Sequence, residues 1–155
     1  MATKGKKATA HDAQVIMELY DLRREPMMRK ARDFVTTQFW PSTFEEFAGV
    51  MNSFGSEHNA YLRQALTYWD MAAAMVLEGA VHEGLFFKCN GELHFLFAKF
   101  GHHFPQLRKD SGNAEFLANF EKLATKTPEA KARVKRIHEV LKARGAALAK
   151  AKAAN

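Results

Sequence analysis

The sequence has little of several features that would define other classes of protein. It contains a single cysteine, Cys89, and four prolines. One cysteine excludes a disulfide within the chain and suits a reducing compartment, so we interpret Cys89 as a partly buried structural residue and expect a cytoplasmic protein. No period-two alternation long enough for a strand, no internal repeat and no catalytic signature such as a nucleophile elbow is present.

Long hydrophobic runs are also missing. The longest stretch of apolar residues without a polar one, 71–77, is far shorter than the roughly 20 residues that a bilayer-spanning helix needs. The first ten residues, MATKGKKATA, are basic without an apolar segment behind them, which does not predict a secretory leader. We therefore expect no membrane span.

The sequence does hold enough apolar material for a core. Hydrophobic residues make up 47% of the 155 residues, and thirteen of them are Phe. This composition is typical of one globular domain. The helical spacing of its apolar residues predicts an all-α fold, a compact bundle of six to eight helices around a central apolar helix over residues 57–78.

That central helix has recognisable ends. Ser56 is suited to cap its first turn, and Gly79 is suited to the left-handed residue after its last turn. Every residue in 71–77 is apolar, so neighbouring helices should cover all its faces. Upstream, we expect Asp12 to cap a first helix, Pro26 to start a second that runs to about Gln38, and Ser42 or Thr43 to cap a third. Downstream, we expect short helices over 82–88, 92–100 and 115–125.

Charge is distributed unevenly along the chain. Residues 1–10 have a net charge of +3, residues 122–155 have +8, and residues 11–121 have −5. We therefore divide the chain into a flexible basic arm (1–10), a helical bundle domain (11–125) and a basic Ala/Lys-rich C-terminal helix with its tail (126–155).

Four segments, all within about residues 16–109, resemble known sequences: LYDLRREPMMRKARDF, FWPSTFEEF, YLRQALTYWDMAAAMVLEGAVHEGLFF and FPQLRK. They are similar to a group of uncharacterised bacterial helical proteins, a domain of unknown function. The resemblance implies an all-α fold and assigns no activity, so it transfers no catalytic residue.

Asp70 is the one charge in the middle of the central helix, and a buried carboxylate needs a partner. Candidate partners are Arg23, Arg24, Arg29, Arg32 and Arg108. We predict a buried ion pair between Asp70 and Arg32 that fixes the helix register. The alternative is an acidic residue that lines a pocket.

The histidines form no recognisable metal site. Glu78 and His82 are four residues apart, but Gly79 lies between them and should end the helix. His102 and His103 are adjacent, so on a helix their side chains would diverge by about 100°, and we expect them in a loop or capping role. Even with His94 included, the spacing favours no metal or haem ligation. We predict no catalytic residue, metal or cofactor.

The basic C-terminal helix is the clearest functional candidate. Its densest cations are candidate phosphate-binding residues: Lys131, Arg133, Lys135, Arg136, Lys142 and Arg144. Because no aromatic residue accompanies them, binding to nucleic acid would be independent of sequence and strongly dependent on salt. The competing interpretation is a solvated helix face.

These observations favour a non-enzymatic interaction or regulatory module, whose partner is another protein or a second copy of the chain. The alternative is a nucleic-acid-associated protein that acts through its C-terminal helix. A third hypothesis is a helical bundle that binds a small molecule, haem or metal.

Overall fold

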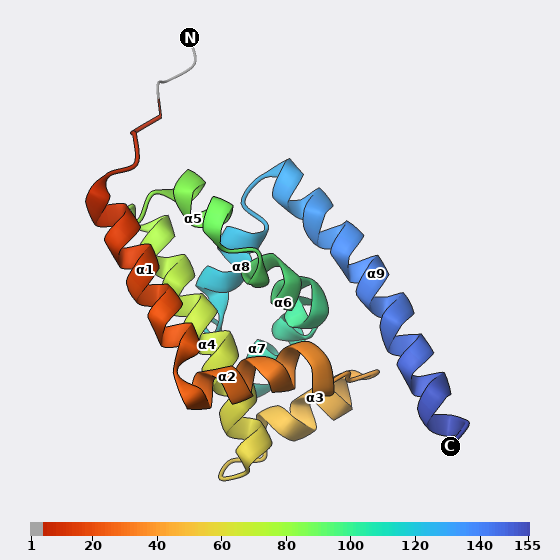
Figure 1. Ribbon diagram of the computed structural model, residues 1–155. Coiled ribbons are helices and arrows are strands. Elements are labelled where there is room, and N and C mark those ends of the chain that lie inside the picture. Colours follow the sequence, from red (N-terminus) through yellow and green to blue (C-terminus); the bar gives the residue numbers. More distant parts are fainter. Residues whose placement is uncertain (1–4) are drawn as a thin grey trace.

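The computed structural model describes residues 5–155, and its regular elements are helical throughout this range (Figure 1). The expectation of an all-α fold is confirmed. In chain order the elements are α1 (Ala10–Arg24), α2 (Pro26–Asp33), the π-helix η1 (Phe34–Gln38), α3 (Phe44–Met51), α4 (Glu57–Leu77), α5 (Glu83–Cys89), α6 (Glu92–Phe100), the 3₁₀-helix η2 (Gly101–His103), α7 (Phe104–Ser111), α8 (Ala118–Ala124) and α9 (Pro128–Ala153).

Helix α4 is central, as its sequence predicts. The Ser56 hydroxyl accepts a hydrogen bond from the Asn59 amide at 3.1 Å, and Gly79 adopts φ +76° after the last turn. Helices α2, α3, α5 and α8 all contact α4. The expected cover is incomplete, because Met71 is 41% exposed and Ala74, Met75 and Leu77 are only partly buried.

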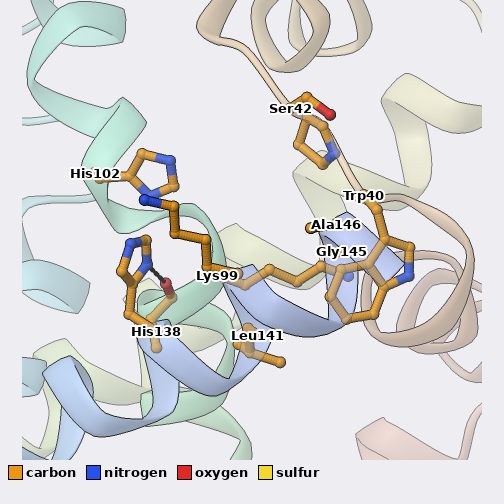
Figure 2. Close-up of a pocket in the computed structure, with 11 residues that line it drawn as sticks. Trp40, Ser42, Lys99, His102, His138, Leu141, Gly145 and Ala146 are labelled. Carbon is orange, nitrogen blue, oxygen red and sulfur yellow. Dashed lines mark hydrogen bonds between the residues drawn. The ribbon is translucent and has the colours of Figure 1, made fainter. Parts of the chain in front are cut away.

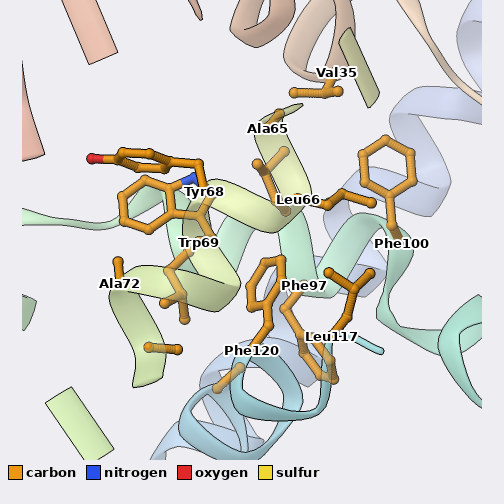
Figure 3. Packing of buried hydrophobic residues seen from close by; sticks show 14 of the residues in the cluster. Val35, Ala65, Leu66, Tyr68, Trp69, Ala72, Phe97, Phe100, Leu117 and Phe120 are labelled. Carbon is orange, nitrogen blue, oxygen red and sulfur yellow. The ribbon is translucent and has the colours of Figure 1, made fainter. Parts of the chain in front are cut away.

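The core forms where α4, α6 and α8 meet (Figure 3). Trp69 and Leu66 of α4 are fully buried, as are Phe100 of α6 and Phe120 of α8. The Phe97 and Phe120 rings lie 5.8 Å apart in a tilted arrangement, which is favourable for aromatic pairs. These contacts pack α6 against the interior of the bundle, and α9 covers its other side.

The start of α1 differs from the prediction. Thr9, not Asp12, is the N-cap, and Asp12 occupies the third helical position of a reciprocal capping box. The second carboxylate oxygen of Asp12 accepts a hydrogen bond from the His82 amide at 2.8 Å, so this residue also ties α1 to the start of α5. Of the predicted basic arm, residues 1–4 lie outside the described residues.

The second helix follows the expected range, but its last turn is a π-helix. The Phe39 amide donates to the Phe34 carbonyl at 2.9 Å, five residues back. Trp40 and Pro41 then leave the helix, as the restriction on a residue before proline requires. The wider turn places Val35 and Trp40 against α6.

Helix α8 begins later than residue 115. Leu117 lies in the left-handed region with φ +58°, and the helix starts at Ala118. Arg108 of α7 donates hydrogen bonds to the carbonyls of Phe116 and Leu117, at 2.7 and 3.1 Å. These tertiary hydrogen bonds satisfy the carbonyl groups of a bent segment. The local sequence pattern alone predicts a helix there.

The predicted ion pair between Asp70 and Arg32 is wrong. Asp70 accepts a hydrogen bond from the Phe120 amide at 2.9 Å, and Asn119 Nδ2 lies 3.4 Å from its other oxygen. Helix α8 has no cap from its own side chains, so Asp70 of α4 neutralises the positive end of that helix.

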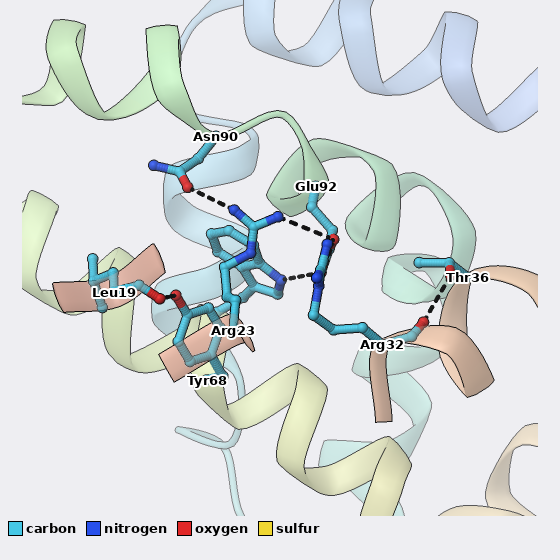
Figure 4. Close-up of polar contacts among 8 residues, drawn as sticks. Leu19, Arg23, Arg32, Thr36, Tyr68, Asn90 and Glu92 are labelled. Atoms are coloured by element: carbon cyan, nitrogen blue, oxygen red, sulfur yellow. Dashed lines mark hydrogen bonds and ion pairs between the residues drawn. The ribbon is translucent and has the colours of Figure 1, made fainter. Parts of the chain in front are cut away.

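Arg32 instead pairs with Glu92 (Figure 4). Its Nη2 lies 2.6 Å from Glu92 Oε2, while Arg23 Nη2 lies 3.4 Å from the same oxygen. The Trp69 indole nitrogen donates to Glu92 Oε1 at 3.2 Å. One carboxylate at the first turn of α6 thus joins α1, α2 and α4, and it raises the pKa of Arg32.

Helix α9 runs along the side of the molecule opposite α1 and packs on α6 (Figure 1). Only Leu141 of this helix is buried, while Val134 and Ile137 are partly covered. All residues after Gly145 are exposed. The predicted division into three regions stays a prediction, but the first two-thirds of α9 packs on the bundle.

Candidate ligand-binding pocket

A pocket of about 420 Å³ lies between α6 and α9 and is closed on a third side by residues 40–42 (Figure 2). We call it the Lys99 pocket. The residues that line it are Trp40, Pro41, Ser42, Ala98, Lys99, His102, His138, Leu141, Lys142, Gly145 and Ala146. The lining therefore combines apolar and cationic groups and includes no carboxylate.

Lys99 is the most unusual residue of this pocket. It is only 7% exposed, and Figure 2 shows its chain extending toward Trp40. Its Nζ donates to the Val35 carbonyl at 2.7 Å and lies 3.7 Å from the centroid of the Trp40 ring. Burial, with a smaller contribution from the charge of Arg144, lowers the pKa of Lys99 to about 7. A strongly shifted pKa on the wall of a cavity makes Lys99 a candidate functional residue.

Two histidines line the opposite side of the pocket. Their rings lie 5.1 Å apart, His102 on η2 and His138 on α9. His138 Nδ1 lies 2.8 Å from the Ala98 carbonyl oxygen, so this nitrogen carries the proton that is donated. Neighbouring protein atoms shield part of the His102 ring from water, and this partial desolvation, followed by the charge of His138, lowers the pKa of His102.

The neighbouring His103 corrects the expectation of a loop role for both adjacent histidines. His102 is exposed, but His103 is only 5% exposed and stacks on Phe47 with ring centroids 4.8 Å apart. Burial lowers the pKa of His103 to about 4, so its ring is neutral at pH 7. His103 is therefore part of the core rather than of the pocket.

Trp40 gives the pocket a flat wall. Its indole nitrogen donates to the Thr37 carbonyl at 2.8 Å, which fixes the ring at the end of the π-helix. The guanidinium of Arg144 lies 5.6 Å from the ring centroid. Gly145 of α9 faces the same ring, where a Cβ would make only ordinary contact at 3.5 Å.

The six candidate phosphate-binding residues are all exposed. None of them forms an ion pair with another residue in the range 5–155. At 100° per residue, Lys131, Lys135 and Lys142 share one flank of the packed stripe of α9, while Arg133, Arg136 and Arg144 lie on its other side. The structure therefore separates the six cations into two groups on different sides of α9. Lys142, which belongs to the first group, borders the Lys99 pocket.

Other candidate chemistry finds little support in the described part of the chain. No three His, Cys, Asp or Glu side chains there are arranged to hold a metal ion. Cys89 is exposed, which corrects the interpretation of a partly buried cysteine. Within residues 5–155 no helix has both the length and the apolar character needed to cross a bilayer.

Sequence reasoning missed Lys99 and Glu92. A signal for Lys99 was present, because it is the one basic residue in the otherwise aromatic and aliphatic segment 93–100 apart from His94. No comparable signal marked Glu92, because an acidic residue is common in the first turn of a helix. Its partners Arg23 and Arg32 are more than fifty residues away in sequence.

A comparison with protein families matches most of the chain to one family. Residues 8–127 match the family described as Domain of unknown function (DUF4760). No curated protein and no solved structure matches the chain. The match ends at the last residue before α9, so one side of the Lys99 pocket comes from the matched region and the other from a helix outside it.

Proposed function

Because the chain belongs to the DUF4760 family, a domain of unknown function, we propose its role from the pocket geometry: a non-enzymatic regulatory module that binds a small organic anion in the Lys99 pocket. The observation that carries this proposal is Lys99 itself, a buried amine on the wall of a cavity without a carboxylate.

The charges and the flat wall define the class of ligand. Lys99 and Lys142 favour an anion, and His138 adds a polar ring to the same cavity. Trp40 offers a face on which a planar group can stack. The volume of about 420 Å³ is in the usual range for small-molecule sites. The ligand class is therefore a carboxylate or phosphate attached to a flat, largely apolar group.

The position of the pocket suggests how binding would be regulatory. An occupant would touch Trp40 and Lys99 on the bundle and Lys142 on α9 at the same time. A ligand that contacts both sides stabilises their association through its binding free energy. Occupancy would thus fix α9 and the cations that it presents.

The proposal can be tested by following backbone and indole N–H signals by NMR during titration with three probes. Indole-3-acetate has a flat ring and a negative charge, tryptamine has the ring with a positive charge, and acetate has the charge alone. We expect indole-3-acetate to shift the Trp40 indole signal most. The substitutions W40L and K142Q should each weaken its binding at least fivefold, and K150Q on the exposed end of α9 should not. Equal responses to tryptamine and indole-3-acetate would exclude an anion site.

A second candidate function is sequence-independent binding of nucleic acid through α9. It is favoured by the exposure of the six cations and their lack of ion pairs within residues 5–155. Binding of this kind releases counterions and weakens steeply with salt. Fluorescence anisotropy with a DNA duplex at low and moderate salt tests it. The double variant K131Q/K135Q, which alters neither wall of the Lys99 pocket, should weaken binding and reduce the salt slope by about two. An unchanged affinity would exclude the flank of α9 that carries Lys131 and Lys135 as the surface that binds nucleic acid.

A further inference from the structure

A second cavity, of about 470 Å³, lies at the other end of the interface between α6 and α9, and residues of α5 and of the end of α8 also line it. We call it the His94 pocket. His94 comes from α6, Phe87 from α5 and Leu123 from α8, while Arg133 and Arg136 come from α9. The two cavities share no lining residue.

His94 has no hydrogen-bond partner within the described chain. The residue is 3% exposed, and neither ring nitrogen bonds to another group in residues 5–155. One face of the ring packs near Phe87, with centroids 4.9 Å apart. A buried donor and acceptor without partners are energetically unfavourable, so the His94 ring is suited to a ligand that supplies a partner.

The charges around His94 indicate which ligand would satisfy it. Burial and, next, the charge of Arg133 lower the pKa of His94 to about 4. Lys126 forms an ion pair with Glu83 at the edge of the cavity, so these two charges offset one another. The remaining charges are those of Arg133 and Arg136 against Glu129, which leaves a net positive site.

Arg133 and Arg136 are suited to hold an oxyanion. Residues three apart are neighbours on a helix surface, so both guanidinium groups can approach one group bound beside α9. Guanidinium groups match the oxygen geometry of phosphate in a bidentate manner. Neither arginine forms an ion pair with a carboxylate in the described range. A metal cation is disfavoured here by the same two charges.

We propose that the His94 pocket binds a phosphate group, with Arg133 and Arg136 neutralising its charge and the His94 ring donating a hydrogen bond to one of its oxygens. The site is independent of the Lys99 pocket, and its occupant is either free phosphate or a phosphate monoester. Both sources present the same oxygens to the two arginines.

Occupation of this site would change the protonation of His94. A bound anion offsets the charge of Arg133 and supplies an acceptor for the ring, so both causes raise the pKa of His94 toward its ordinary value. The other charged groups that line the cavity around the ring are Glu83 of α5, Lys126 before α9, and Glu129 and Arg136 of α9. The pKa of His94 should therefore be higher in the occupied site than in the free protein.

The test uses the full chain with inorganic phosphate and with phenyl phosphate as probes. Calorimetry measures affinity, and NMR of the imidazole nitrogens reports the state of His94. We expect phosphate to shift the His94 ring signals and to raise its pKa by at least one unit. R133Q and R136Q should each weaken binding at least tenfold, whereas K122Q on the exposed surface of α8 should not.

Two further outcomes decide the proposal. Tighter binding of phenyl phosphate than of inorganic phosphate would assign the site to a monoester, and the reverse would assign it to the free ion. Unchanged His94 signals at saturating phosphate, or equal affinity in R133Q and the wild type, would overturn the proposal. H94F tests the ring itself, and the two arginine variants decide the question even if that variant does not fold. K142Q should leave phosphate binding intact, which separates this result from the function proposed for the Lys99 pocket.

Discussion

The ammonium group of Lys99 lies 3.7 Å from the centroid of the Trp40 ring and donates to the Val35 carbonyl at 2.7 Å. The ring and the carbonyl both belong to the end of the second helix, where the π-turn brings them to α6. One buried amine therefore holds this turn in place and faces a cavity that α9 completes.

The first prediction concerns the pH dependence of stability. The unfolded chain keeps Lys99 protonated up to about 10.5, whereas burial lowers the folded pKa to about 7. Between these values the unfolded state binds more protons, so this residue makes the free energy of unfolding increase as pH rises from 7 to 10. Denaturant unfolding of the wild type and of K99M across this range should show the increase in the wild type only. Parallel curves would mean that Lys99 is charged in the folded protein.

The second prediction concerns Glu92. The substitution E92Q removes the negative charge that Arg23 and Arg32 share, and the Glu92 side chain is only 10% exposed. Removal of one partner from a buried ion pair leaves uncompensated charge, so we expect a loss of about 3 kcal/mol in the free energy of unfolding. The matched substitution E139Q, on the exposed face of α9, should change stability by less than about 0.5 kcal/mol. Equal effects of the two substitutions would show that the network contributes no net stability.

The third prediction concerns acid. Burial lowers the folded pKa of His103 to about 4, against 6.5 in the unfolded chain. The unfolded state therefore binds more protons between these values, and this contribution to stability is lost as pH falls from 6.5 to 4. H103F retains the stacking on Phe47 and cannot be protonated. Its melting temperature should fall less than that of the wild type between pH 7 and 4.5, and an identical fall would assign the acid sensitivity to other groups.

The fourth prediction compares two glycines. A Cβ on Gly101 would lie 2.5 Å from Phe97 Cε2, and the Phe97 ring is held by its contacts with Phe104 and Phe120. We expect G101A to cost about 1–3 kcal/mol because the ring must move within a packed core. Gly49 in α3 has nothing within 4 Å of an added Cβ, so G49A should stabilise the protein by about 0.5–1 kcal/mol. Chemical denaturation of both variants measures the contrast, and a neutral G101A would mean that the core relaxes around the methyl group.

Local sequence signals account for most of the helical framework. Ser56 and Gly79 set the ends of α4, Thr127 and Pro128 begin α9, and Pro41 follows the end of the second helix. Each of these effects acts within a few residues of the chain, through a capping hydrogen bond or a restricted backbone angle. For the same reason the exposed cations of α9 could be identified without a structure.

The partners of the buried and partly buried charges were decided only by the tertiary structure. Asp70 caps α8 instead of binding Arg32, which pairs with Glu92, and Lys99 finds a carbonyl and an aromatic ring instead of a carboxylate. A buried polar group accepts any partner of suitable charge and geometry, and sequence spacing does not rank partners that are fifty residues away. The two cavities along α9 likewise exist only because that helix packs on α6, which no local pattern specifies.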